Sequence, residues 1–128
     1  MGVGVQRRMR VVVADDNDDL REMLRILLDF EEIDVVGETG NGLEAIDLVR
    51  ELAPDVVLID HHMPGMDGLE TTTRLRAQDP DVRIILFTGT DEYELDTDRA
   101  HEAGVSAIVS KDVTELVEEI KSGPTRPG

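Results

Sequence analysis

Five residues with reactive or metal-binding side chains stand where a stretch of apolar sequence ends. They are three aspartates, a threonine and a lysine: Asp15, Asp16, Asp60, Thr88 and Lys111. If the apolar stretches are parallel strands of one sheet, their carboxyl ends lie at the same edge, where open α/β sheets bind ligands. The sequence therefore predicts that these five side chains meet in one crevice.

The chemistry of this set points to a metal ion and a phosphoryl group. Three neighbouring carboxylates repel one another and need a cation, and all-oxygen ligands favour Mg²⁺ first and Mn²⁺ second. Lys111 would add a positive charge and Thr88 a hydroxyl donor, so each could face one phosphoryl oxygen. No glycine-rich phosphate loop follows the first apolar stretch, which argues against a nucleotide cradle. A carboxylate could itself be the nucleophile and form an acyl phosphate.

Each of these residues also has an ordinary structural explanation when it is taken alone. Asp16 could help to begin a helix, and Lys111 could be one of the many lysines that only keep a surface solvated. The coincidence of all five positions with the ends of apolar stretches favours the functional interpretation.

The elements that must position these residues are short strands alternating with helices. Continuous β-branched stretches are typical of parallel strands buried on both faces, and a shorter, more polar stretch is typical of an edge strand. The buried strands are expected at residues 11–14, 56–59, 84–87 and, more weakly, 105–109, and the edge strand at 34–38.

Helical periodicity fills the intervals between these strands. Apolar residues recur at i, i+3, i+4 and i+7 within residues 20–27, 45–52 and 113–120. A helix with a thin apolar face is expected at 68–77, and the weakest helical pattern covers 91–103. Asn17 or Asp18 could cap the first helix and Asn41 the second, and Pro54 ends the second.

The resulting fold class is α/β, a (βα)5 unit in which a five-stranded parallel sheet is doubly wound, with helices on both faces. A chain of 128 residues suits one domain. The domain is expected at residues 9–122, after an N-terminal extension at 1–8. The glycine- and proline-containing segment 123–128 is expected to be a linker or a disordered tail.

Composition excludes several classes of function. The formal net charge of −16 argues against binding of nucleic acid or an anionic membrane through this domain. The absence of cysteine excludes disulfides and thiolate chemistry, and no apolar run is long enough to span a membrane. The first residues lack the apolar core of a signal peptide, so a cytoplasmic location is expected.

Taken together, the motifs resemble the receiver domain of bacterial two-component response regulators across residues 9–122. The segment VVLIDHHMPGMDG at 56–68 is similar to the family's phosphoacceptor motif. The order of the other motifs also fits: VVADD at 12–16, Phe87-Thr88-Gly89, Ala103-Gly104 and Ser110-Lys111-Asp112. The resemblance implies a flavodoxin-like sheet with strand order 2-1-3-4-5.

The resemblance also assigns roles to residues. Asp60 would be the phosphorylated aspartate, Thr88 would hydrogen-bond the phosphoryl group and Lys111 would pair with it. Asp16 and Asp60 would ligate Mg²⁺, with the backbone carbonyl of His62, and Asp15 would act through a metal-bound water. The phosphoryl donor would be a sensor histidine kinase or a phosphotransfer protein, and a homodimer could form through the face of the fourth and fifth helices. The chain would be a signalling phosphoacceptor with intrinsic phosphorylation and dephosphorylation chemistry rather than an enzyme acting on other molecules.

Three features depart from the family pattern. Ile108 stands where the family usually has tyrosine or phenylalanine, so the switch pair would be Thr88 and Ile108. The interval from Thr88 to Gly104 is one residue longer than expected. Asp112 replaces the common proline after the lysine.

Other functions remain open on the sequence alone. Asp16-Asn17-Asp18 loosely fits the Asp-x-Asp motif of haloacid-dehalogenase-like phosphatases, although the usual Gly-Thr is missing and there is no room for a cap domain. A receiver-like interaction module that is never phosphorylated is a further alternative. His61 and His62 could be considered as zinc ligands, but ordinary loop histidines are the simpler interpretation.

Overall fold

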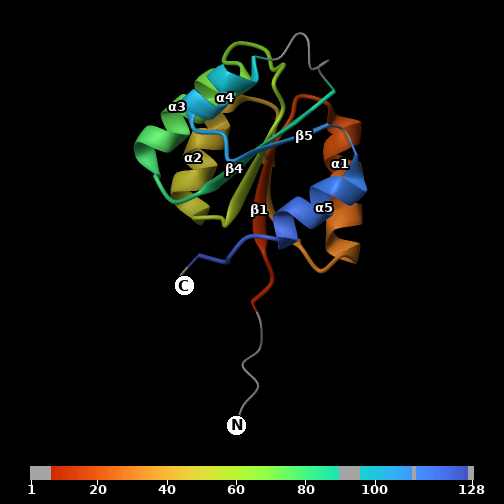
Figure 1. The fold of residues 1–128 in the computed structure, drawn as a ribbon. Coiled ribbons are helices and arrows are strands. Elements are labelled where there is room, and N and C mark those ends of the chain that lie inside the picture. Colours follow the sequence, from red (N-terminus) through yellow and green to blue (C-terminus); the bar gives the residue numbers. More distant parts are fainter. Residues whose placement is uncertain (1–6, 90–95, 111, 127–128) are drawn as a thin grey trace.

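The protein is an α/β domain in which strands and helices alternate along the chain. The computed structural model describes residues 7–89, 96–110 and 112–126. In this part of the chain the order is β1 (Arg10–Ala14), α1 (Asp18–Phe30), β2 (Asp34–Thr39), α2 (Gly42–Leu52), β3 (Val56–Ile59), α3 (Gly68–Gln78), β4 (Arg83–Thr88), α4 (Thr97–Ala103), β5 (Ala107–Ser110) and α5 (Val113–Lys121). The predicted (βα)5 order is confirmed (Figure 1).

The five strands form one parallel sheet in the order β2-β1-β3-β4-β5. Helices α1 and α5 cover one face, and α2, α3 and α4 cover the other (Figure 1). Strands β1 and β3 are buried throughout, apart from the first residue of β1, whereas the edge strand β2 is mostly half-buried. The predicted strand order and the expected edge position of the 34–38 segment are therefore confirmed.

Alternate residues of the strands enter two separate aliphatic cores, because successive side chains point to opposite faces of a sheet. Val12, Ala14, Val57 and Ile59 pack under α2, α3 and α4. Val11, Val13, Val56 and Leu58 pack under α1 and α5. Because both faces of these strands are buried, their sequences are continuous apolar stretches in which polar and apolar residues do not alternate.

The helices begin after an asparagine or aspartate whose side chain accepts the backbone N–H of the residue three positions later. The cap of α1 is Asn17, which resolves the choice between Asn17 and Asp18, and the cap of α2 is Asn41, as predicted. Asp67, Asp96 and Asp112 cap α3, α4 and α5. Because every helix follows a strand, these caps gather at the carboxyl edge of the sheet and concentrate negative charge there.

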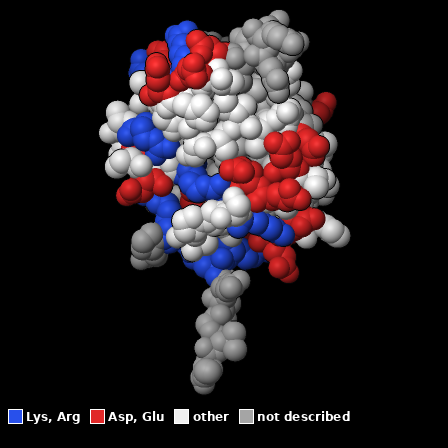
Figure 2. All heavy atoms as spheres, viewed as in Figure 1, with Lys and Arg blue, Asp and Glu red and all other residues white. Residues whose placement is uncertain are grey.

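At the opposite edge of the sheet, arginine side chains bind the backbone carbonyls at the C-terminal ends of helices. Arg10 donates to the carbonyls of Leu52 and Ala53 at the end of α2, at 2.7 and 3.2 Å. Arg83 donates to the carbonyls of Glu119 and Ile120 at the end of α5. Cations are favourable at helix C-termini, where carbonyls lack intrahelical partners. Basic side chains accordingly gather toward the lower end of the molecule in Figure 2.

Two elements differ from the sequence-based bounds. α4 begins at Thr97, after the Asp96 cap, and not at residue 91; residues 91–95 lie outside the described residues. Asp96 accepts the N–H of Arg99, which fixes the first turn of α4 at Thr97. β5 covers Ala107–Ser110 and not 105–109, because Gly104 ends α4 with a positive φ and Val105 still packs into the core.

Helix α3 shows how a thin apolar face is buried. Thr71 and Thr72 are completely buried in it. Their hydroxyls donate to the carbonyls of Asp67 and Gly68, four residues earlier, at 2.8 and 2.7 Å. Each hydroxyl is satisfied within its own helix, so its methyl group can pack like an apolar side chain. The predicted helix at 68–77 is confirmed and extends to Gln78.

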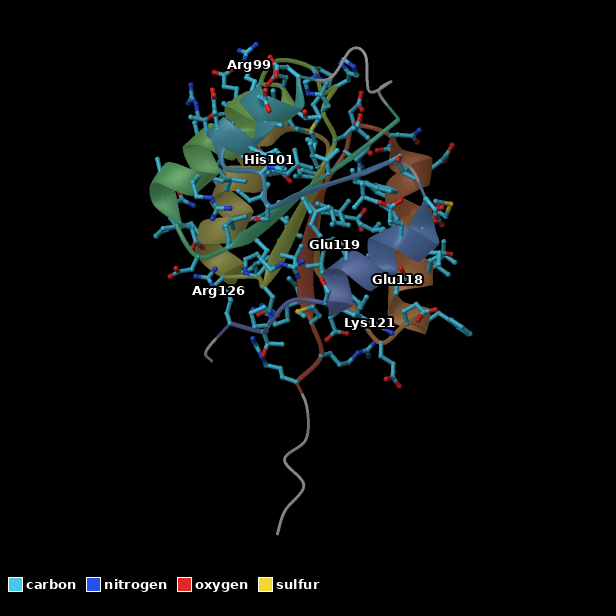
Figure 3. All side chains as sticks on the ribbon, viewed as in Figure 1. Arg99, His101, Glu118, Glu119, Lys121 and Arg126 are labelled. Atoms are coloured by element: carbon cyan, nitrogen blue, oxygen red, sulfur yellow. The ribbon has the colours of Figure 1, made fainter. Side chains whose placement is uncertain are left out.

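Both ends of the described chain meet at the buried carboxylate of Asp55. This side chain accepts hydrogen bonds from the backbone N–H of Arg10 at 2.8 Å, the Arg7 guanidinium at 2.8 Å and the backbone N–H of Arg126 at 2.6 Å. Arg126 belongs to the segment expected to be a linker or tail. It lies at the lower end of the sheet below α2 (Figure 3), where its guanidinium pairs with Asp79 at 2.6 Å.

The pairing of Arg126 with Asp79 makes stability depend on pH. Burial raises the pKa of Asp79, but the Arg126 guanidinium and the N–H groups of Asp81 and Val82 outweigh it and hold the pKa below 3.8. A carboxyl with a lowered folded pKa stabilises the fold above its unfolded pKa, and this contribution is lost as the pH falls through the folded value.

We expect Arg126→Ala to lower the free energy of unfolding at pH 7 by about 1.5–3 kcal/mol, the usual contribution of a hydrogen bond to a charged group. The difference in unfolding free energy between the variant and the wild type should shrink in acid, as the pH falls through the lowered folded pKa of Asp79 and its carboxyl becomes protonated. Urea unfolding followed by circular dichroism at several pH values measures this. Arg74→Ala, which removes an exposed pair with Glu70, is the control and should cost no more than about 0.5 kcal/mol. A difference between variant and wild type that does not shrink at all as the pH is lowered would contradict the role of the ion pair.

Among the described residues, no helix has the length and apolar character that a membrane span requires.

Candidate functional site

Three of the five predicted site residues meet at the carboxyl edge of the sheet. The β1–α1 loop supplies Asp15 and Asp16, and Asp60 follows β3 directly. One carboxylate oxygen from each lies within 4.8 Å of the others. Asp15 is buried, Asp60 is half-buried and Asp16 is exposed. The structure therefore brings together three of the five side chains that the sequence places in one crevice.

The strands bring the carboxylates together through backbone pairing. Asp60 donates its N–H to the carbonyl of Ala14 at 2.9 Å, which fixes the end of β3 beside the end of β1. Asp15 donates its N–H to the carbonyl of Thr39 at the same distance, on the side of β2. The Asp15 carboxylate also accepts the backbone N–H of Asn17 at 2.9 Å, which orients it. The acidic cluster is therefore held by rigid sheet edges and a short turn.

Thr88 ends β4 on the other side of Asp60. Parallel pairing sets Ile59 opposite Leu86, so Thr88 lies two residues further along β4, at the same edge of the sheet. Its side chain is buried. Thr88 also pairs in register with Ser110 at the end of β5. Lys111, the next residue, lies outside the described residues.

Ile108 lies on β5, in register with Leu86. Its side chain is half-buried and packs against the core under α2, α3 and α4. It is therefore two residues before Ser110 and separated from the acidic cluster by β4. Ile108 therefore packs against the hydrophobic core and does not lie in the acidic cluster.

The loop after Asp60 depends on a glycine at the start of α3. Gly68 donates its N–H to the carbonyl of His61 at 3.0 Å. A Cβ atom on Gly68 would lie only 2.5 Å from the carbonyl oxygen of Asp60 and 2.9 Å from Cα of His61. Since backbone atoms cannot move aside cheaply, glycine is required here for the loop to fold back onto Asp60.

The two loop histidines do not join the acidic cluster. Their rings stack at an angle, with centroids 4.6 Å apart. Among the described residues, the group of side chains that could hold a metal ion consists of aspartates alone. Within the same part of the chain, no hydrogen bond reaches the His62 carbonyl, whereas the His61 carbonyl is occupied by Gly68.

The donor set fits a hard divalent cation. All its atoms are carboxylate oxygens, which Mg²⁺ accepts readily, and the three carboxylates bring enough negative charge to neutralise it. The remaining face of the cluster is open to solvent through Asp16, which leaves an approach for a ligand from outside.

Comparison with known proteins agrees with this geometry. The model of the response regulator receiver domain matches residues 11–121. The chain belongs to the response regulator receiver domain family. Response regulator GacA of Pseudomonas aeruginosa is 38% identical over 116 residues, which cover 88% of this chain and 54% of that protein. This receiver domain thus spans about half the length of the curated relatives it matches.

Solved structures show the same fold. A LuxR-family two-component response regulator from Aurantimonas sp. is 35% identical with a TM-score of 0.84, covering 91% of this receiver domain and 84% of that chain. Response regulator protein TrrA from Thermotoga maritima, solved in complex with Mg²⁺ and BeF, is 32% identical with a TM-score of 0.80, covering 89% and 97%. The receiver domain is of the type found in LuxR- and NarL-like regulators and is a phosphoacceptor in two-component signalling.

Sequence reasoning missed residues that support the site from outside. Arg21 donates to the carbonyl of Asp15 in the β1–α1 loop, and a Cβ atom on Gly40 would meet both Arg21 and Asp16. Arg21 follows Asp15 by six residues, in the first turn of α1. A helix that starts at residue 18 brings this position back over the loop, which is the signal that could have identified it.

Proposed function

We propose that this receiver domain takes a phosphoryl group onto Asp60, in a Mg²⁺-dependent reaction, from a sensor histidine kinase or a phosphotransfer protein. The observation that carries the proposal is the meeting of Asp15, Asp16 and Asp60 at the carboxyl edge of the sheet, with their oxygens within 4.8 Å of one another. Of the three, Asp60 alone follows β3, the middle strand of the sheet, and it lies in the segment that resembles the phosphoacceptor motif.

The metal-binding part of the proposal names the residues that would hold the ion. Asp16 and Asp60 would bind Mg²⁺ through their side chains, His62 through its backbone carbonyl, and Asp15 through a water. Mn²⁺, which accepts the same oxygen ligands, would substitute. When bound, the cation neutralises charge on the transferring phosphoryl oxygens.

The residues of the chain perform the transfer itself. A carboxylate oxygen of Asp60 attacks phosphorus, the new O–P bond forms, and the bond to the donor's imidazole nitrogen breaks as that ring departs. Thr88, buried at the end of β4, donates its hydroxyl to a phosphoryl oxygen, and Lys111 pairs with another. Hydrolysis later returns Asp60 to a carboxylate and releases inorganic phosphate, so the domain is a phosphoacceptor with intrinsic chemistry only.

The response to phosphorylation would pass through Thr88 and Ile108. Ile108 is β-branched and stiff at χ1, so it cannot report the change by the rotation of an aromatic ring. We propose that the response alters packing on the face of α4 and α5, where a homodimer could form. The domain would act alone or as the N-terminal part of a DNA-binding regulator, since a similar protein from Staphylococcus aureus is a DNA-binding response regulator.

The test is chemical labelling of the purified domain. Incubation with acetyl phosphate and Mg²⁺ should add one phosphoryl group that is lost in acid or hydroxylamine, as an acyl phosphate is. Reduction with borohydride followed by peptide mass spectrometry should place it at Asp60. Excess chelator should prevent labelling. A label on Asp16 would favour the phosphatase-like alternative, and no label at all would favour the interaction module that is never phosphorylated.

A further inference from the structure

The β1–α1 loop carries two of the three clustered carboxylates, and its backbone is held by a side chain outside the cluster. Nη1 of Arg21 donates to the carbonyl oxygen of Asp15 at 2.5 Å. That carbonyl belongs to the peptide group joining Asp15 to Asp16, so the arginine fixes the plane of this peptide. The plane of the peptide sets the direction in which the Asp16 side chain leaves the loop.

Asp16 depends on this peptide more than its neighbour does. The Asp15 carboxylate is oriented by the N–H of Asn17, and the backbone N–H of Asp15 is held by Thr39. Within the described part of the chain, no hydrogen bond or ion pair reaches the Asp16 carboxylate. Its position is therefore set by its own backbone and side-chain torsions.

The arginine is itself rigidly placed. Its guanidinium pairs with Asp18 on the same helix, and Nε faces Oε1 of Glu38 on β2 at 3.5 Å. The side chain is only 16% exposed. Gly40 leaves little free space beside the guanidinium. A Cβ atom on Gly40 would lie 3.3 Å from Nη1 of Arg21 and 3.6 Å from Cα of Asp16. The planar fork of an arginine can bind several acceptors at once in fixed directions.

We propose that Arg21 is a positioning residue for the divalent cation, which acts by holding the Asp15–Asp16 peptide so that the Asp16 carboxylate is preorganised toward Asp60. This inference rests on the proposed function. Groups that orient metal ligands from outside commonly change metal affinity by about tenfold or more.

The charge of Arg21 and its positioning role predict opposite effects on Mg²⁺ binding, so one measurement distinguishes them. A guanidinium beside a cation site repels the cation, so removing it should strengthen Mg²⁺ binding if Arg21 acts only through its charge. A positioning role requires weaker binding after the same removal, because the ligands lose their arrangement.

The experiment is calorimetric titration of Mg²⁺ into the folded protein, well below its melting temperature. Arg21→Gln should bind Mg²⁺ about tenfold more weakly than wild type. Arg21→Lys keeps the charge but lacks the fork, and should bind with intermediate affinity. Arg25→Gln is the matched control: Arg25 lies one turn further along α1, shares Glu38 as a partner at 3.3 Å, is 53% exposed and does not contact the loop. It should bind Mg²⁺ as tightly as wild type or slightly more tightly.

The outcomes separate this inference from the proposed function. Weaker binding by Arg21→Gln together with unweakened binding by Arg25→Gln supports the positioning role. Unchanged or tighter binding by Arg21→Gln, in a protein whose wild type binds Mg²⁺ and whose Asp16→Asn variant does not, overturns the role of Arg21 alone. A folded wild type that binds no Mg²⁺ overturns both. Circular dichroism of each variant confirms that the titrated protein is folded.

Discussion

Asp60→Asn should take up no phosphoryl group from acetyl phosphate under conditions that label the wild type. The substitution keeps the size of the side chain, but an amide oxygen is too weak a nucleophile to form the O–P bond. It also removes one of the charges in the acidic cluster, which weakens the binding of a divalent cation. The loss should be complete within the detection limit of intact-protein mass spectrometry.

The loop offers a matched control seven residues later. Asp67 is exposed and caps α3 by accepting the N–H of Glu70 at 2.8 Å. Asparagine is as good a helix cap as aspartate, so Asp67→Asn should fold and be labelled like the wild type. If Asp60→Asn retains the label in full, the phosphorylated residue lies elsewhere. If both variants lose it, the effect belongs to the loop as a whole and Asp60 is not distinguished as the acceptor.

Asp55→Ala should have the largest effect on stability, although Asp55 lies at the edge of the sheet opposite the acidic cluster. Its side chain is fully buried and accepts the N–H groups of Arg10 and Arg126 together with the Arg7 guanidinium. Removing the carboxylate leaves the N–H groups of Arg10 and Arg126 without this acceptor, and leaves the Arg7 guanidinium with the Arg126 carbonyl in place of a charged partner. We expect a loss of about 3 kcal/mol in the free energy of unfolding, typical of breaking a buried ion pair from one side.

Urea unfolding followed by circular dichroism measures this loss, since the chain has no tryptophan. Asp29→Ala is the control, because Asp29 also pairs with an arginine of the N-terminal segment, Arg8, but its side chain is 75% exposed. It should cost no more than about 0.5 kcal/mol. Phosphoryl uptake by Asp55→Ala at low temperature should persist, which would separate this stabilising residue from the chemistry. Equal losses of unfolding free energy in Asp55→Ala and Asp29→Ala would show that the buried carboxylate of Asp55 contributes no more to stability than the exposed one of Asp29.

Much of the fold could be predicted because its signals are local. Each buried strand is a short apolar stretch rich in β-branched residues, and helices α1, α2 and α5 each have a periodic apolar face. The parallel arrangement follows from the alternation of strands and helices. The location of Asp15, Asp16 and Asp60 follows from the same rule, since Asp15 and Asp60 come directly after a strand and Asp16 is the next residue after Asp15. The roles of Asp60, Thr88, Lys111 and His62 in phosphoryl transfer stay predictions.

Only the tertiary structure decided what supports these elements. The start of α4 at Thr97 depends on which aspartate of an acidic stretch becomes the cap, and several were equally suitable by type. The contacts of Arg21 with the Asp15 carbonyl and Glu38 join a helix to a loop and to a neighbouring strand. The bond from Arg126 to Asp55 spans 71 residues. An arginine or a buried aspartate carries no periodicity that names its partner, because the partner is chosen by the packing of the sheet and helices around it.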